Sequence, residues 1–318
     1  MLIIFFQLSY FASLKSRLIV MTYLFLVCFF IWRFNLRYGV DLSNALDQWI
    51  EYIDKKGQSL SRYIEDKSEV DFWKGIYRRK ERPIDPYSVH VREFLDKFLQ
   101  DYDLESGLEL GPGWGNYTFF LAKRLESLDL VDISPDAINY LKKKAGEKNI
   151  DNLNFFVSSF SDFSFQTYDL IFAFNCFYRE REIVKFLKNL STSAKKLVVL
   201  GMITSYEPAF NLELRDKYSY NLCGMGNDYV LLMNILYTLG IEANQIILPI
   251  SRKYTFKNLD QVKSHEIFRI NEPYDNSLVD SILLKYLKKE EDGYSLVVDC
   301  KAAIIYWHPS EQVSEKKF

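Results

Sequence analysis

Five short apolar segments with strand character recur between residues 106 and 202, and segments with helical spacing separate them. A strand, a helix and a further strand form a right-handed crossover, which places the strands parallel and covers both faces of the sheet. The sequence therefore predicts an α/β fold with a doubly wound, mostly parallel sheet. The five expected strands are residues 106–110, 128–132, 153–157, 168–174 and 196–202. The expected helices are residues 116–126, 134–146 and 183–190.

The segment before this alternation is helical and rich in polar residues. Leu42, Leu46, Trp49 and Ile53 recur at spacings of four, three and four, which places them on one face of a helix. Residues 41–100 hold too little apolar surface to fold alone, so we expect N-terminal helices that pack on the main domain and act as a lid.

Two aromatic residues of this segment have two interpretations. Trp73 and Tyr77 either belong to a lid that closes over a bound ligand or simply pack one helix against the domain.

The segment after the alternation is less regular. Residues 205–226 show no clear period, and we expect an insertion over about residues 205–240 that lies beside a substrate. The sequence further predicts two helices and two strands, and whether these strands close the sheet in antiparallel orientation stays open. The helices are residues 229–239 and 276–290, and the strands are residues 244–249 and 294–307.

Residues 1–40 differ in composition from the rest of the chain. The chain has a formal net charge of −2, but this leader has four basic residues and no acidic residue, so the remainder carries about −6. The apolar run over residues 18–32 would reach about 22 Å as a helix, short of the roughly 30 Å of a bilayer core. No signal-peptide cleavage site follows the run. The leader is therefore either a membrane anchor or interfacial segment, or an over-long gene start with translation beginning near Val40, and both alternatives leave the body in the cytosol.

Composition excludes several classes of protein. With 48% hydrophobic and 26% charged residues, the chain is neither disordered nor collagen-like, and the acidic body does not suit a broad nucleic-acid surface. The cysteines are far apart and the three histidines form no zinc-binding pattern, so we expect no metal site and a reducing compartment. The four cysteines are Cys28, Cys176, Cys223 and Cys300.

A glycine-rich loop follows the first expected strand. Gly111, Gly113 and Gly115 let the backbone adopt unusual angles and approach a ligand closely. The dinucleotide pattern G-x-G-x-x-G fails because Asn116 stands at its last position, and no phosphate-binding P-loop occurs in the chain.

Glu109 and these three glycines resemble motif I of the class I S-adenosylmethionine-dependent methyltransferases, in which an acidic residue precedes three alternating glycines. The resemblance implies a Rossmann-like fold and S-adenosyl-L-methionine as cofactor. It implies that Gly111, Gly113 and Gly115 lie along the methionine part, with Glu109 near the amino group. Asp132, 21 residues after the first glycine, then stands where the family binds both ribose hydroxyls.

Two further motifs of the family are partly matched. Ser159 occupies the position of the aspartate that binds the adenine amino group, with Phe160 against the ring and Asp162 as an alternative polar contact. Asn175 and Cys176 follow the fourth strand at the rim of the expected site, and Cys176 is interpreted as a small apolar filler. The segment lacks the Asn-Leu-Pro-Tyr type sequence of amino-directed nucleic-acid methyltransferases.

The resemblance covers residues 70–205 best and implies a methyltransferase domain over residues 101–318. We expect a cytoplasmic enzyme that methylates an unidentified small molecule, with a membrane as partner through residues 1–32 only if the leader is an anchor. The alternatives are a membrane-associated S-adenosylmethionine-binding protein without turnover, and an RNA or protein methyltransferase. The sequence does not choose a catalytic base among the side chains available, which are Tyr178, Glu207, Glu180 and His265.

Overall fold

The computed structural model describes residues 42–59, 61–78, 86–204, 208–222, 228–265, 267–270 and 272–309. The apolar leader, Cys28, Glu207 and Cys223 lie outside the described residues. Among the helices of the described ranges, none has both the length and the apolar character needed to cross a membrane.

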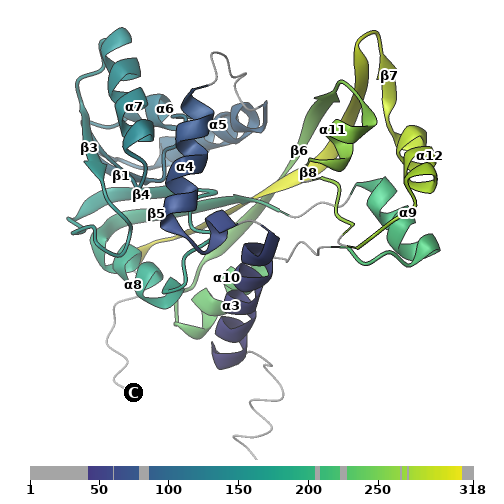
Figure 1. Ribbon diagram of the computed structural model, residues 1–318. Coiled ribbons are helices and arrows are strands. Elements are labelled where there is room, and N and C mark those ends of the chain that lie inside the picture. The colour runs from purple at the N-terminus through teal and green to yellow at the C-terminus, as the bar shows by residue number, and fades with distance from the viewer. Residues whose placement is uncertain are drawn as a thin grey trace, which may run out of the picture.

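The central sheet has the predicted doubly wound core. Five parallel strands follow the order β3-β2-β1-β4-β5, so the chain winds outward in both directions from β1 (Figure 1). All five strands appear where the alternation of the sequence placed them. Their bounds are β1 (Ser106–Leu110), β2 (Ser127–Asp132), β3 (Leu153–Val157), β4 (Tyr168–Phe174) and β5 (Ala194–Ile203).

Two long strands complete the sheet and settle the orientation that the sequence left open. The strand β8 (Gly293–Trp307) pairs antiparallel with β5, and β6 (Asn244–Phe256) pairs antiparallel with β8 at the edge. The expected strand over residues 244–249 was too short, since β6 continues through Pro249 to Phe256. An edge strand tolerates proline, since one side of its backbone has no strand to bond.

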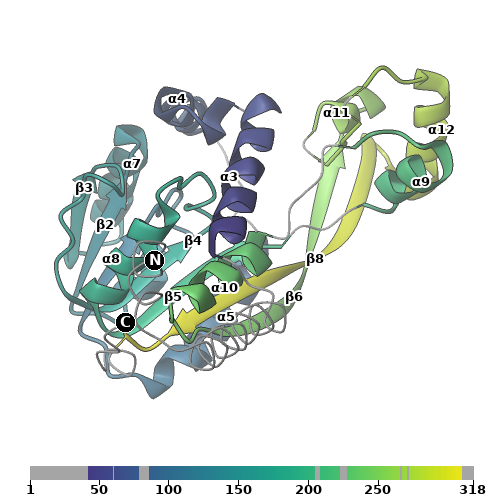
Figure 2. The same cartoon turned by 90° about the horizontal axis from the view of Figure 1, so that it is seen from below.

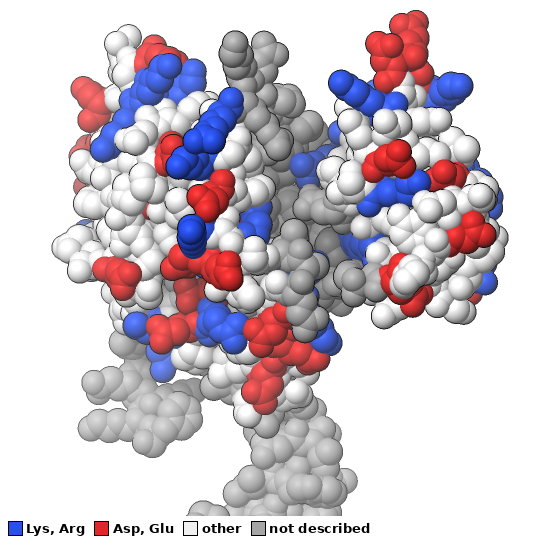
Figure 3. All heavy atoms as spheres, in the orientation of Figure 1, with Lys and Arg blue, Asp and Glu red and all other residues white. Residues whose placement is uncertain are grey.

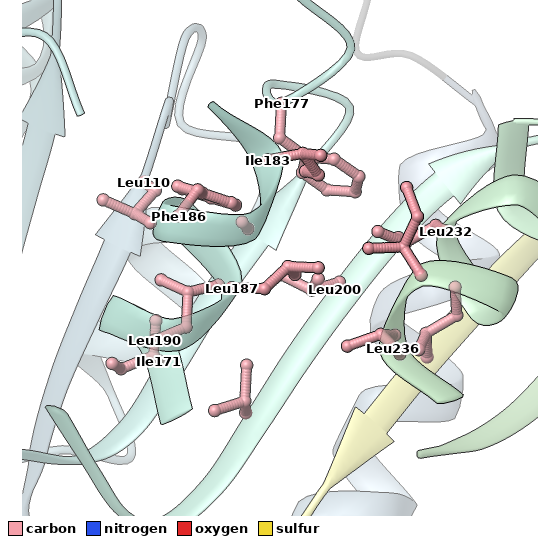
Figure 4. Packing of buried hydrophobic residues seen from close by; sticks show 14 of the residues in the cluster. Leu110, Ile171, Phe177, Ile183, Phe186, Leu187, Leu190, Leu200, Leu232 and Leu236 are labelled. Carbon is pink, nitrogen blue, oxygen red and sulfur yellow. The ribbon is translucent and has the colours of Figure 1, made fainter. Parts of the chain in front are cut away.

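Helices cover both faces of the sheet. On one face lie α3 (Leu42–Ser59), α8 (Ile183–Ser193) and α10 (Asp228–Thr238), and Figure 2 shows α3 beside α10. In Figure 4, side chains of α8 and α10 point toward the strands, as Leu187 does toward Leu200. The opposite face is covered by α5 (Pro86–Phe98), α6 (Thr118–Ala122) and α7 (Pro135–Glu147).

The boundaries of two helices differ from prediction. Helix α7 begins as expected, with Ser134 Oγ accepting a hydrogen bond from Ala137 N at 3.3 Å, but Gly146 lies inside the helix and is not its C-terminal cap. The left-handed turn falls instead on Asn149, with a φ of 53°. Helix α6 is shorter than residues 116–126 because Glu126 N already bonds to Glu105 O at 2.7 Å on the way into β2.

A second unit, which we call the lobe, lies beside the main body. The outer halves of β6 and β8 extend beyond the sheet and carry four further elements around a separate apolar cluster (Figures 1 and 3). Helix α9 was not expected, because Asn211 and Glu213 are buried beside Phe210 and Leu214 and break its apolar pattern. The four elements are α9 (Ala209–Tyr218), α11 (Leu259–Lys263), α12 (Asn276–Tyr286) and β7 (Lys288–Glu290).

Candidate cofactor and acceptor site

A cavity of about 810 Å³ opens at the carboxyl ends of the parallel strands, where doubly wound sheets bind their ligands. Its walls come from the glycine loop after β1, from the ends of β2 and β4, and from β6 of the lobe. The helix α4 (Asp66–Tyr77) and the short 3-10 helix η1 (Ser61–Tyr63) close one side.

The three glycines of the loop all have left-handed backbone angles, with φ of 59° at Gly111, 50° at Gly113 and 74° at Gly115. Gly111 and Gly113 line the cavity. A Cβ on Gly111 would lie 2.3 Å from Cys176 Cβ, so glycine is required here because the loop lies close to Cys176. The described wall of the cavity does not include Gly115, which packs against Leu141 of α7.

Asp132 ends β2 and is buried beside the glycine loop. Its Oδ2 accepts a hydrogen bond from Gly113 N at 3.3 Å, and its Oδ1 accepts one from Ser134 N at 2.9 Å. Burial raises the pKa of Asp132 to about 6, and the two backbone hydrogen bonds oppose this change. A carboxylate offers about four lone-pair positions, so two remain for the paired hydroxyls of a ribose.

Glu109 lies inside β1, buried, and faces the cavity. Thr118 Oγ1 donates to its Oε2 at 2.6 Å. Burial raises the pKa of Glu109 to about 8, and the nearby charge of Asp132 adds to the effect. A cationic group next to Glu109 would stabilise its ionised form.

Two predicted adenine contacts line the cavity near β3. Ser159 Oγ donates to Asp162 Oδ2 at 2.7 Å, while Asp162 itself is exposed and is not part of the described wall. Phe160 borders the cavity and also stacks on Phe186, with ring centroids 5.5 Å apart. Ser159 is thus a polar side chain that lines the cavity at the position of the family's aspartate, and its contact with adenine stays a prediction.

The residues after β4 are fixed by neighbouring backbone. Asn175 has a φ of 52°, and its Oδ1 accepts a hydrogen bond from Ile203 N at 2.8 Å, which ties β4 to β5. Cys176 Sγ donates to Leu110 O at 3.1 Å, and burial raises the pKa of this thiol well above its usual value. Both residues border the cavity, and a neutral Cys176 agrees with its interpretation as a filler.

Tyr178 belongs to a half-buried polar cluster that the sequence did not indicate. Its hydroxyl donates to Glu69 Oε1 at 2.8 Å and accepts a hydrogen bond from Arg62 Nη2. Arg62 Nε also contacts Glu69 Oε2 at 2.8 Å. Trp73 Nε1 donates to Glu69 Oε1 at 2.8 Å. Burial raises the pKa of Tyr178 well above its ordinary value, with the negative charge of Glu69 adding to it. No sequence motif marks this cluster, because its members lie on η1, α4 and a segment about 110 residues later.

Helix α4 contacts the glycine loop directly. Tyr77 Oη donates to Gly113 O at 2.6 Å, and its ring lies 4.3 Å from that of Trp114. Trp73 approaches the same glycine, since a Cβ there would lie 3.0 Å from its indole ring. Trp73 and Tyr77 therefore pack on the glycine loop, and Trp73 also borders the cavity; their role as a lid stays a prediction.

Two further candidate bases, Glu180 and His265, line different walls of the cavity. The Glu180 carboxylate accepts a hydrogen bond from Glu182 N at 3.0 Å, and burial raises its pKa. His265 borders the cavity from the lobe, and its Nδ1 accepts a hydrogen bond from Ile267 N at 3.3 Å. Within the described ranges, no three His, Cys, Asp or Glu side chains come together as a metal site.

Residues 108–196 match a family model described as a methyltransferase domain. The matched segment begins in β1, contains the glycine loop and Asp132, and reaches into β5, so it contains the cofactor end of the cavity. No curated protein matches the chain.

Solved structures of similar fold have low sequence identity. The YcgJ protein from Bacillus subtilis is 14% identical, with 69% of this chain and 97% of that chain covered and a TM-score of 0.48. The N-methyltransferase NodS from Bradyrhizobium japonicum, in complex with S-adenosyl-L-homocysteine, is 12% identical, with 75% and 97% covered and a TM-score of 0.44. The magnesium protoporphyrin IX methyltransferase ChlM from Synechocystis, with bound S-adenosylhomocysteine, is 13% identical, with 78% and 99% covered and a TM-score of 0.44.

The family match and the site agree on the cofactor. The buried carboxylate at the end of β2 and the left-handed glycine loop fit S-adenosylmethionine, the cofactor of this family. Residues 108–196 match the methyltransferase domain model, and in this part the chain is similar to the class I S-adenosylmethionine-dependent methyltransferases.

Proposed function

We propose that this protein transfers a methyl group from S-adenosylmethionine to a small molecule. The observation that carries the proposal is the continuity of the cavity, which extends from Asp132 and Gly113 to Arg252 on the lobe. Pockets for small ligands measure about 300–1,000 Å³, and 810 Å³ lies in the upper part of that range. This size supports binding of an acceptor beside the cofactor.

The bound cofactor supplies a methyl group on a positively charged sulfur. That methyl group would pass to an electron pair of the acceptor with the carbon–sulfur electron pair left on sulfur, and any acceptor proton would go to a base or to water. The protein's own part is alignment, which in well-oriented reactions contributes roughly 7–11 kcal/mol. In this proposal Asp132 holds the ribose hydroxyls, Glu109 holds the amino group, and the loop with Gly111 and Gly113 follows the methionine part.

We further propose that the adenine contacts come from Ser159 and Phe160, with Asn175 shaping the rim. Gly115 contributes by fixing the loop to α7, since it packs there and not at the cavity wall.

We assign Tyr178 a positioning role. Its hydroxyl is hydrogen-bonded to Glu69 and Arg62, and its raised pKa keeps it protonated at neutral pH, so it does not serve as a base. Tyr178 thereby links the segment after β4 to α4 and η1, which form one side of the cavity. Glu207, the other catalytic candidate, stays a sequence-based prediction, because it lies outside the described residues.

We propose a reducing, cytoplasmic compartment for the body of the protein. The two described cysteines, Cys176 and Cys300, are free thiols, which is compatible with that compartment. Membrane association through residues 1–32 is a separate proposal, and N-terminal mass spectrometry of the native protein tests it. A mature start near Val40 would refute it.

The function is tested by incubating the protein with methyl-labelled S-adenosylmethionine and cell extract, followed by separation into lipid, small-molecule, RNA and protein fractions. We expect label in the small-molecule fraction, and we expect much less with Asp132→Asn. The matched control is Asp151→Asn, an exposed aspartate away from the cavity. Label in RNA or protein, or cofactor binding with no label in any fraction, would contradict the proposal.

A further inference from the structure

The carboxylate of Glu69 receives hydrogen bonds from three separate segments of the chain. Arg62 Nε of η1 donates to its Oε2 at 2.8 Å, and Tyr178 Oη of the segment after β4 donates to its Oε1 at 2.8 Å. Trp73 Nε1, one turn later in α4, donates to the same Oε1 at 2.8 Å. Glu69 is only 5% exposed, although its helix lies at the side of the cavity. It holds each donor in one orientation, because a buried polar group left without its partner costs free energy.

Two further ion pairs connect the N-terminal helices to the segment after β4. Arg179 pairs with Asp66 in the first turn of α4, and Arg181 Nη1 lies 2.6 Å from Asp54 Oδ1 of α3. All three arginines on this side of the cavity therefore have a carboxylate partner. Ion pairs with exposed partners contribute little to stability, so the buried Glu69 makes the main polar connection between these elements.

Trp73 lies between Glu69 and the glycine loop. Its indole nitrogen is bonded to Glu69, while the six-membered part of the indole approaches Gly113, where an added Cβ would lie 3.0 Å from Trp73 Cη2. Gly113 has a φ of 50° and donates its N–H to Asp132 Oδ2. Trp73 and Gly113 both border the cavity. A change in the orientation of the indole would therefore reach the backbone of the loop that faces the cofactor.

We propose that Glu69 is a positioning residue for S-adenosylmethionine. It acts through Trp73, which it holds against Gly113, and it thereby fixes the part of the loop that follows the methionine part of the cofactor. The ribose end depends less on this contact, because Asp132 also accepts a hydrogen bond from Ser134 N at 2.9 Å. The inference rests on the proposed function and adds a residue that sets cofactor affinity through a neighbouring side chain.

The first test measures the Kd of two ligands for the full chain by titration calorimetry. The ligands are S-adenosylmethionine and 5′-methylthioadenosine, which has the adenine and the ribose but lacks the amino-acid part. We expect Glu69→Gln to raise the Kd for S-adenosylmethionine at least fivefold and to change the Kd for 5′-methylthioadenosine less than twofold. Asp71→Asn is the matched control, because Asp71 is an exposed residue of the same helix away from the cavity, and it should bind both ligands like the wild type.

The pH of these titrations is set by Asp132. Burial raises the pKa of Asp132 to about 6, and the negative charge of Glu69 adds to this effect. Glu69→Gln removes that charge, so the titrations are run at pH 8, where Asp132 is ionised in every variant.

The second test asks whether Glu69 acts through Trp73. Trp73→Phe removes the indole N–H and keeps an aromatic ring. We expect it to raise the Kd for S-adenosylmethionine about as much as Glu69→Gln does. The double variant should bind within twofold of the weaker single variant, because the two substitutions break one contact and their effects do not add.

Four results would contradict these expectations. An unchanged Kd for S-adenosylmethionine in Glu69→Gln, or an equal rise for both ligands, overturns the inference and leaves the proposed function intact. Effects of the two substitutions that multiply in the double variant also overturn it, since Glu69 would then act independently of Trp73. If Glu69→Gln does not fold, an unchanged Kd in Trp73→Phe overturns the inference by itself. A wild-type chain that binds neither ligand contradicts the proposed function and removes the inference with it.

Discussion

Replacing Gly111 by alanine is expected to lower the free energy of unfolding by about 2–5 kcal/mol. The φ of 59° places alanine in the left-handed region, which costs roughly 1–2 kcal/mol. The new Cβ would lie 2.3 Å from Cys176 Cβ, so side chain or backbone must move, and overpacking of this kind costs about 1–3 kcal/mol. The two costs act on the same residue but have separate causes.

A double-mutant cycle separates the two costs. In a Cys176→Gly background the clashing Cβ is absent, so Gly111→Ala should cost only the backbone contribution of roughly 1–2 kcal/mol. Gly240→Ala is the matched control, because Gly240 has a φ of 74° and no atom within 4 Å of its added Cβ. Urea unfolding followed by circular dichroism measures all four variants. An equal cost of Gly111→Ala in both backgrounds would refute the close approach.

Three further predictions concern titratable side chains of the site, namely Glu109, Asp132 and Tyr178. The pKa of Glu109 rises on folding from about 4.5 to about 8, so its contribution to stability is present below pH 4.5 and is lost as the pH rises through 8. Unfolding of the wild type should therefore become easier between pH 5 and pH 8, and Glu109→Gln should flatten this slope; an equal slope in both proteins would contradict it. The pKa of Asp132 is about 6, and in the proposed role its ionised form accepts the ribose hydroxyls, so the Kd for S-adenosylmethionine should increase up to tenfold per pH unit below 6, measured by titration calorimetry; a constant Kd from pH 7.5 to 5 argues against that role. Tyr178→Phe should reduce thermal stability by about 1–2 kcal/mol through the lost hydrogen bonds with Glu69 and Arg62, with no change in the pH profile of kcat. Loss of one limb of that profile would instead identify Tyr178 as the base.

The parts of the fold set by local pattern could be predicted. Strands β1 to β5 are short apolar runs between turn residues, and the start of α7 follows from Ser134 and Pro135. Glu109 and Asp132, which stand at fixed distances from the glycines, both line the cavity, while their contacts with the cofactor stay a prediction.

The parts that depend on distant contacts could not be predicted. The full length of β6 depends on its pairing with β8, and the lobe depends on apolar residues collected from four separate segments. Glu69 lies in a segment that is rich in polar residues, and its burial depends on Arg62 and on Tyr178, which lies 109 positions further along the chain. Arg252 lay beyond the expected end of its strand, so nothing in the local pattern connected it with the site.

Titration of the full chain with S-adenosylmethionine tests the central claim most directly. We predict one binding site per chain, and we predict that Asp132→Asn raises the Kd at least tenfold, since a hydrogen bond to a charged group contributes about 1.5–3 kcal/mol. Asp151→Asn should bind like the wild type. No binding by the wild type, or equal binding by Asp132→Asn with an unchanged melting temperature, would contradict the account.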